Sequence, residues 1–173
     1  MKVIDLIRFY LQDCNSVLDL GCGTGWVLNE LNKRKMVGID LYVDHLVQAV
    51  DDNPMATFIR GDINNITTYF VRKSFDAIIL IDSLEHLTKQ EGLQLLKACE
   101  VISKKKIIVF TPLGEVHNNT KINKWNKHNS GWVVQDLQKL GYSTAQFNNY
   151  HLGTERLEDL DAILAWKELN PNY

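Results

Sequence analysis

The sequence predicts an α/β domain in which a doubly wound, mainly parallel sheet carries helices on both faces. Short apolar segments alternate with segments of helical periodicity through most of the chain, and this order is typical of βαβ units. The segment 75–82, FDAIILID, is a continuous apolar run, as expected for a strand covered by helices on both sides. Right-handed crossovers place helices on both faces of such a sheet. With 173 residues, no internal repeat and no evident linker, the chain is expected to form one domain spanning 1–173.

The first forty residues are expected to contain two helices and two strands. Residues 3–10 place apolar side chains at helical spacing, which predicts an amphipathic helix. A short apolar strand, SVLDL at 16–20, follows and leads into a glycine-rich turn at 21–25. We expect a helix over 26–34 and a second strand, KMVGID, at 35–40.

Between residues 42 and 74 we expect a helix, a strand and a connection. The helix covers 42–50, where four residues follow the i, i+3, i+4, i+7 pattern of an apolar helix face. These residues are Val43, Leu46, Val47 and Val50. Asn53-Pro54 ends the helix because the position before proline disfavours helical backbone. The third strand is expected at 56–62, and a polar, partly helical connection at 63–74.

The remainder of the chain is expected to add two helices, a fifth strand and a terminal pair of strands. Thr88-Lys-Gln-Glu91 matches a capping box and begins a helix that continues to residue 103. The later elements are a strand at 105–112 stopped by Pro112, a polar insert at 113–131, a helix at 132–140 closed by Gly141, and strands at 142–150 and 161–168. Because no helix separates the last two strands, we expect them to form a hairpin at one edge of the sheet.

Composition argues against several classes of protein. The formal net charge of -2 provides no overall field that would attract nucleic acid or an anionic membrane. No apolar run approaches the roughly 18 residues of a membrane span, and Asp5, Arg8 and Asp13 argue against a signal peptide. Three scattered cysteines without a CxxC pair are typical of reduced thiols. We therefore expect a cytoplasmic protein without a nucleic-acid partner.

The glycine-rich turn distinguishes two kinds of ligand. In VLDLGCGTG the glycines are Gly21, Gly23 and Gly25. A dinucleotide site has the pattern GxGxxG, and its third glycine would fall on Trp26 here. S-adenosylmethionine carries a positive sulfonium and no phosphate, so its site needs carboxylates and bare backbone more than a phosphate-binding helix. Asp19, just before the turn, can face the amino group of such a ligand.

Two further acidic residues indicate an adenosine-type ligand. Asp40 lies 19 residues after Gly21 and ends the second expected strand, where an acidic residue accepts hydrogen bonds from ribose hydroxyls. Asp62 follows the third strand and can accept a bond from the adenine amino group, while Ile63 covers the ring. Both ligand classes require Asp40, whereas an acid at the place of Asp62 is not part of the dinucleotide fingerprint.

Five segments together resemble the class I S-adenosylmethionine-dependent methyltransferases. They are VLDLGCGTG, VGID, GDI, FDAIILIDSLEHL and KIIVFTPLG, in that family's order. The resemblance implies a Rossmann-like seven-stranded sheet of order 3-2-1-4-5-7-6 with one antiparallel strand. It also implies S-adenosyl-L-methionine as cofactor and S-adenosyl-L-homocysteine as product. The residues that it places at the cofactor are Asp19, Gly21, Cys22, Gly23, Asp40, Leu41, Asp62, Ile63 and Asp82.

Histidines near the carboxyl ends of the fourth and fifth strands are the candidate catalytic residues. Methyl transfer from a sulfonium is an in-line displacement, so the protein must mainly align the acceptor and exclude water. A hydroxyl acceptor also needs a base within hydrogen-bond reach. The candidates are His86, in DSLEHL, and His117 and His128, in the insert. TPLG followed by KHNSGW is similar to small single-domain methyltransferases of glycan and polysaccharide synthesis, which implies a small-molecule or glycan acceptor.

An RNA 2′-O-methyltransferase that uses a metal is a competing hypothesis. Asp82-x-x-Glu85-His86, with His117 or His128, partly resembles the Glu-x-x-Glu-His cluster and the further histidine of small-RNA 3′-end enzymes. A site of carboxylates and imidazoles suits a divalent cation. Because Asp82 is more simply assigned to the cofactor, no metal ligand is assigned.

Two more hypotheses concern different classes of protein. A module that binds the cofactor without transferring a methyl group is disfavoured by the intact glycines and by Asp40. An NAD-dependent oxidoreductase is disfavoured by Trp26 and by the absence of a recognisable catalytic Tyr-Lys or His-Asp pair. The sequence predicts no particular oligomeric state.

Overall fold

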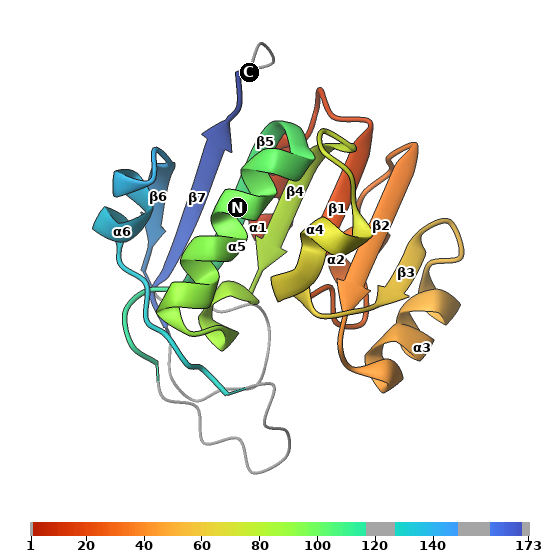
Figure 1. Ribbon diagram of the computed structural model, residues 1–173, viewed down its shortest axis with the longest axis horizontal. Coiled ribbons are helices and arrows are strands. Elements are labelled where there is room, and N and C mark those ends of the chain that lie inside the picture. The colour runs from red at the N-terminus through yellow and green to blue at the C-terminus, as the bar shows by residue number, and fades with distance from the viewer. Residues whose placement is uncertain (1, 117–126, 149–159, 171–173) are drawn as a thin grey trace.

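One seven-stranded sheet organises the protein (Figure 1). The computed structural model describes residues 2–116, 127–148 and 160–170. The strands are β1 (Ser16–Leu20), β2 (Lys35–Asp40), β3 (Thr57–Arg60), β4 (Phe75–Ile81), β5 (Ser103–Pro112), β6 (Ser143–Phe147) and β7 (Ala162–Glu168). Their order is β3-β2-β1-β4-β5-β7-β6, and β7 runs antiparallel to both of its neighbours. The fold class, the strand order and the terminal hairpin expected from the sequence are confirmed.

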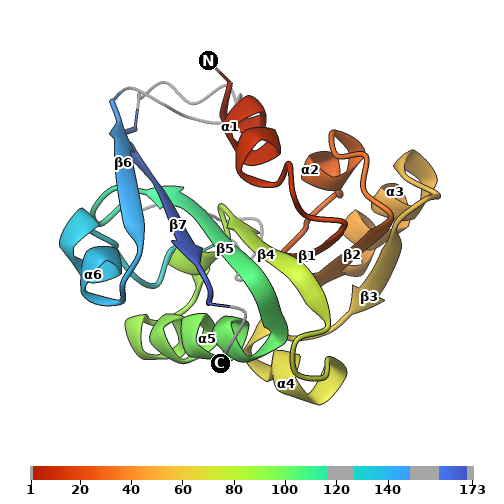
Figure 2. The same cartoon turned by 90° about the horizontal axis from the view of Figure 1, so that it is seen from above.

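Helices cover both faces of the sheet. They are α1 (Val3–Tyr10), α2 (Trp26–Asn29), α3 (Val43–Asp52), α4 (Ile66–Tyr69), α5 (Lys89–Ile102) and α6 (Val134–Lys139), with short 3-10 turns η1 (Ile63–Asn65) and η2 (Leu84–His86). Figure 2 shows α1, α2 and α3 on one face and α4, α5 and α6 on the other. Within the described ranges, no helix is long and apolar enough to cross a lipid bilayer.

The centre of the sheet is buried on both sides, as the apolar run in β4 predicts. All seven residues of β4 and all five of β1 are buried. Leu18 of β1 lies opposite Val37 of β2 and Ile78 of β4, so three β-sheet neighbours share one core layer. The predicted capping box is also present, because the Thr88 N–H donates to Glu91 Oε2 (2.9 Å) and the Glu91 N–H donates to Thr88 Oγ1 (3.3 Å).

The helix expected at 26–34 is much shorter than predicted and ends at Asn29. The main-chain oxygen of Glu30, which a continuing helix would use, accepts a bond from Arg8 Nε instead (2.9 Å). Leu31 leaves the helical path and is buried. Tertiary packing on α1 therefore overrides the helical pattern of this segment.

The apolar face predicted for 42–50 belongs to a real helix, α3, but most of that face is not buried. Only Leu46 and Ala49 of α3 are buried, while three valines of the pattern point to solvent. The reason is the position of α3, which packs on β3 and β2 at the margin of the sheet. Only a narrow stripe of its side chains faces the core there.

Boundaries in the later part of the chain shift by a few residues. The helix that begins after Thr88 ends at Ile102, and β5 already begins at Ser103, whose hydroxyl donates to the Lys106 main-chain oxygen (2.7 Å). Helix α6 begins at Val134, two residues after the expected start, because Trp132 is drawn into the core. Strands β3 and β6 are shorter than expected.

Candidate functional site

The loops that follow β1, β2 and β4 meet at one edge of the sheet. These strands are parallel neighbours, so their carboxyl ends lie together. In Figure 1 the arrowheads of β2 and β4 both point to the lower edge. The segments that carry the predicted cofactor residues are therefore brought to one place by the topology.

The glycine-rich turn needs its glycines for two different reasons. Gly21, Gly23 and Gly25 all have positive φ (74°, 52° and 75°), which side chains rarely adopt. A Cβ on Gly21 would lie 2.7 Å from the Ser83 Cβ, so this glycine lets the loop after β1 contact the loop after β4. A Cβ on Gly23 would meet no described atom within 4 Å. Gly23 thus leaves its main chain open on one side.

Asp40 binds the glycine-rich turn and the start of α3 at once. Its Oδ2 accepts the Gly23 N–H (2.9 Å) and its Oδ1 accepts the Tyr42 N–H (2.8 Å). The side chain is half-buried, and each carboxylate oxygen has a second lone pair. The carboxylate is therefore held in a fixed orientation and retains acceptor capacity for ligand hydroxyls.

Asp19 is a buried carboxyl with an unsatisfied atom. Its residue is 1% exposed, and Oδ2 has no hydrogen-bond partner among the residues that the structure describes. Burial, followed by the charge of Asp40, raises the pKa of Asp19 to about 8. The hydroxyl of Ser83, against Gly21, is likewise buried without a partner in the described ranges. A cationic donor placed here would satisfy a group that is otherwise costly to bury.

The other predicted cofactor residues lie at the ends of β1, β2, β3 and β4. Asp62 Oδ1 accepts the Asn64 N–H (2.9 Å) and caps the turn η1. Ile63 is partly buried against the core of the α5 face, and Leu41 is half-buried directly after Asp40. Asp82, after β4, has a positive φ of 49° and donates its N–H to the Phe110 main-chain oxygen (2.9 Å).

Cys22 has a clear packing role in the turn. Its side chain is buried, and a Cβ on Gly38 would lie 2.7 Å from the Cys22 Sγ. Burial raises the pKa of this thiol far above its usual range, so it stays protonated. The residue fills the space between β2 and the turn as a small apolar group.

Two of the predicted histidines come together beside a buried glutamate. The ring centroids of His86 and His128 lie 5.1 Å apart. One ligand-type atom each from Glu85, His86 and His128 lies within 4.8 Å of the others. Both imidazoles are held by backbone, with His86 Nδ1 3.3 Å from the Lys127 oxygen and His128 Nδ1 2.9 Å from the Val116 oxygen.

Burial sets the protonation of this cluster. It lowers the pKa of His86 below its usual value, which favours the neutral imidazole at pH 7. It raises the pKa of Glu85 to about 7, although the Thr111 hydroxyl donates to Glu85 Oε2 (3.0 Å). The cluster therefore combines a carboxyl group, Glu85, that titrates near pH 7 with an imidazole, His86, that is uncharged at that pH.

The end of the insert is tied to the loop after β4. The main-chain oxygen of Glu85 accepts the N–H groups of Asn129 (2.8 Å) and Ser130 (3.1 Å). Asn129 Nδ2 donates to the His86 oxygen (2.7 Å). This network positions His128 beside His86. His117 lies outside the described residues.

The sequence named Glu85 only within the competing metal hypothesis, and it did not mark Thr111 as a site residue. Glu85 directly precedes His86 at the end of a buried strand, and Thr111 lies in β5 beside it. The available signal was the coincidence of EH after one strand with KHNSGW after its neighbour. Carboxyl ends of neighbouring parallel strands share an edge, so both segments follow strands that end on the same side of the sheet.

Comparisons with known proteins agree with this geometry. Residues 17–106 match a family model described as "Methyltransferase domain". Over 115 residues the chain is 27% identical to a dTDP-3-amino-3,4,6-trideoxy-alpha-D-glucopyranose N,N-dimethyltransferase of Streptomyces venezuelae, covering 64% of this chain and 47% of that protein. Over 86 residues it is 30% identical to the (S)-coclaurine N-methyltransferase of Papaver somniferum, covering 46% of this chain and 24% of that protein. The chain thus spans about half the length of the first relative and about a quarter of the second.

A solved structure shares the fold over nearly the whole chain. It is the magnesium protoporphyrin IX methyltransferase from Synechocystis PCC 6803 with bound SAH. The TM-score is 0.68 at 16% sequence identity, with 97% of this chain and 82% of that chain covered. At this identity the likeness concerns the fold alone.

Proposed function

This chain belongs to the S-adenosylmethionine-dependent methyltransferases, and on that premise we propose that it transfers a methyl group from S-adenosylmethionine to a small-molecule or glycan acceptor. The observation that carries the proposal is the buried Asp19 carboxyl, whose Oδ2 has no partner among the described residues. It lies near the end of the strand that leads into the glycine-rich turn.

The residues at the sheet edge fit this cofactor chemically. Asp40 would accept the ribose hydroxyls, because both of its oxygens are already oriented by main-chain N–H groups. Asp19 would face the ammonium group of the methionine portion, and the open side of Gly23 would accommodate the ligand. Asp62 would accept the adenine amino group, with Leu41 and Ile63 at the ring.

The chemistry divides between the cofactor and the chain. S-adenosylmethionine supplies an activated methyl group on a positively charged sulfur. The protein aligns the acceptor with that group and excludes water, which can contribute roughly 7–11 kcal/mol to lowering the barrier. His86, kept neutral by burial, would take the proton from an acceptor hydroxyl. The ring of His128, whose centroid lies 5.1 Å from that of His86, would help to position the His86 imidazole.

The class of acceptor is inferred from the relatives. One relative is named for dimethylation of a dTDP-linked amino sugar and the other for N-methylation of (S)-coclaurine. Both names indicate small molecules, which agrees with the net charge of -2 and the absence of an overall basic field. A small-molecule or glycan acceptor is therefore favoured over RNA.

An acceptor screen with a radiolabelled methyl group on the cofactor tests the proposal. We expect label to appear in a low-molecular-weight or glycan fraction, and turnover by His86→Ala to fall about 10²–10⁴-fold with cofactor affinity retained. Binding of the cofactor without transfer to any fraction would favour a non-catalytic binding module. Label found in RNA alone would contradict the proposed acceptor class.

A second candidate is metal-assisted transfer to a hydroxyl acceptor, and the cluster of Glu85, His86 and His128 favours it. Two imidazoles and a carboxylate are a ligand set for a divalent transition metal. Nδ1 of both imidazoles is held by a main-chain carbonyl, an arrangement that commonly orients metal-binding histidines. These three residues would hold the ion, which would lower the pKa of an acceptor hydroxyl. Activity that survives excess chelator, together with unchanged Co²⁺ absorption on addition of protein, would exclude this candidate.

A further inference from the structure

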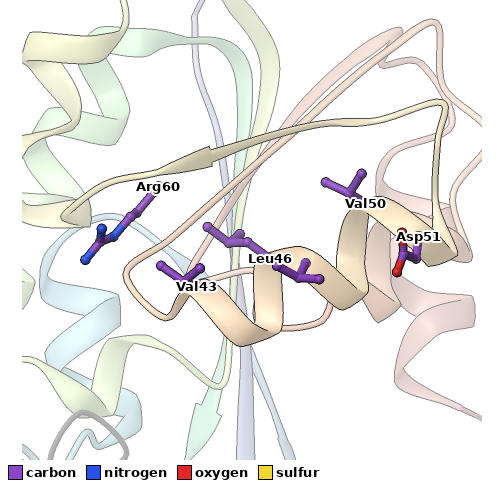
Figure 3. A pocket seen from close by; sticks show the side chains of 6 residues that line it. Val43, Leu46, Val50, Asp51 and Arg60 are labelled. Carbon is purple, nitrogen blue, oxygen red and sulfur yellow. The ribbon is translucent and has the colours of Figure 1, made fainter.

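The outer face of α3 carries a row of exposed apolar side chains. The exposed fractions along this helix are 43% for Val43, 58% for Val47 and 52% for Val50. Together with Leu46 they line a shallow groove whose remaining lining residues are Asp51 and Arg60. Figure 3 shows the apolar side chains between α3 and the end of β3. An exposed apolar row of this kind is a surface that a partner can cover.

The position of α3 explains why this face is available. The helix packs on β2 and β3, and β3 is the outermost strand of the sheet on that side. Figure 1 shows α3 and β3 together at the periphery of the molecule. The residues of α3 that are buried are Leu46 and Ala49, on its inner side. None of the residues proposed to bind the cofactor lines the groove.

Two opposite charges frame the apolar row. Figure 3 shows Arg60 at the end near Val43 and Asp51 at the end beyond Val50. Neither side chain forms an ion pair with any described residue. The surface therefore has one positive end, an apolar middle and one negative end. Such a surface is complementary to itself after a rotation of 180°, which is the requirement for a symmetric dimer contact.

We propose that a second copy of this chain binds to this face, with the two α3 helices antiparallel about a two-fold axis. In this arrangement the apolar rows cover each other, and Arg60 of each chain faces Asp51 of the other at both ends. An anionic membrane surface is the less suitable occupant, because α3 also carries Asp44 and Asp52 and the chain has a net negative charge. The proposal does not depend on the enzymatic activity.

Light scattering coupled to size-exclusion chromatography over a range of protein concentrations gives the first test. We expect the wild type to dimerise with increasing concentration and Val47→Asp to stay monomeric. The matched control is Val101→Asp, which places the same charge at a valine of α5 that is 42% exposed, and it should dimerise like the wild type. A wild type that stays monomeric up to about 200 µM, or a dimer unaffected by Val47→Asp, would overturn the proposal.

A charge exchange tests the two-fold geometry itself. Arg60→Asp places two acids opposite each other at both ends, and Asp51→Arg places two bases there, so each variant alone should dimerise at least about tenfold more weakly. When the two variants are mixed, a heterodimer should form, because the acidic surface of Arg60→Asp then faces the basic surface of Asp51→Arg and both ends regain a pair of opposite charges. If the wild type dimerises but the mixture forms no heterodimer, the antiparallel arrangement is wrong. Binding of the wild type to anionic vesicles in place of self-association would also overturn it.

Discussion

The affinity for S-adenosylhomocysteine should rise steeply between pH 6 and pH 8, because Asp19 must be ionised to face the ammonium group of the ligand. Burial and the charge of Asp40 raise the pKa of Asp19 to about 8 in the empty protein. The carboxyl is therefore mainly protonated at pH 6 and must lose its proton when the ligand binds. With this pKa the ionised fraction rises roughly 50-fold from pH 6 to pH 8, which corresponds to about 2.3 kcal/mol of binding free energy.

Isothermal titration calorimetry at pH 6, 7 and 8 measures this dependence directly. Repeating each titration in two buffers with different ionisation enthalpies counts the protons released on binding. Asp19→Asn should bind weakly at pH 8 and lose the pH dependence, whereas the control Asp62→Asn should keep the slope of the wild type. A wild-type affinity that is constant from pH 6 to pH 8 would refute the reasoning, as would an Asp19→Asn variant that retains the slope.

The same carboxyl should make the empty protein less stable as the pH rises. The folded-state pKa of Asp19, about 8, lies above the unfolded value near 3.9, so the folded state binds the extra proton between these limits. Its contribution to the free energy of unfolding therefore falls as pH increases from about 4 to about 8, by up to roughly 1.4 kcal/mol per pH unit. In urea unfolding experiments, Asp19→Asn should remove the contribution of Asp19 to this decline and leave the part that comes from Glu85, whose pKa is also raised, to about 7; a variant that declines as steeply as the wild type would contradict this.

The remaining predictions concern four other positions at the sheet edge. Asp40→Ala should weaken binding of S-adenosylhomocysteine by about 1.5–3 kcal/mol, since it removes charged hydrogen bonds; unchanged affinity in calorimetry would take Asp40 out of the site. Gly21→Ala should lower the melting temperature more than Gly23→Ala, because only the Cβ on Gly21 would lie 2.7 Å from the Ser83 Cβ, and equal melting temperatures would contradict this. His86→Ala should lower turnover with a hydroxyl acceptor and leave cofactor affinity unchanged, as steady-state kinetics and calorimetry together will show; normal turnover would leave His86 with a structural role only.

Much of the fold could be predicted because local patterns and the core demand the same structure. The seven buried residues of β4 form one nearly uninterrupted apolar run in the sequence. The Thr88–Glu91 capping box marks the start of α5 to the residue. Errors arose where tertiary contacts outweighed local propensity. Just beyond the end of α2, Arg8 donates to the Glu30 oxygen and Leu31 is buried, and no pattern within residues 26–34 reveals these contacts.

The outward valines of α3 show a different limit. Periodicity identifies an apolar helix face, but it does not say what covers that face. Because α3 lies at the edge of the sheet, only Leu46 and Ala49 reach the core. The same apolar pattern that predicted the helix therefore also marks the proposed dimer surface.

The site was predictable where it rests on the order of strands and less so where it rests on loops. Gly21 and Gly23 follow β1, and Asp40 is the last residue of the adjacent parallel strand β2, so the fold itself brings them together. The contact of His86 with His128 depends on the hydrogen bonds of Asn129 to the loop after β4, which are not encoded in any periodicity. Glu85 directly precedes His86, and its side chain accepts a hydrogen bond from Thr111 of β5.

The most direct test of the central claim is a pair of calorimetric titrations of the wild type at pH 8. S-adenosylhomocysteine and NAD⁺ both contain an adenosine that Asp40 can recognise, but only the former carries an ammonium group for Asp19 and lacks phosphates. We expect S-adenosylhomocysteine to bind with a dissociation constant of about micromolar order, roughly −8 kcal/mol, and NAD⁺ to show no heat of binding. Binding of NAD⁺ without binding of S-adenosylhomocysteine would contradict the account.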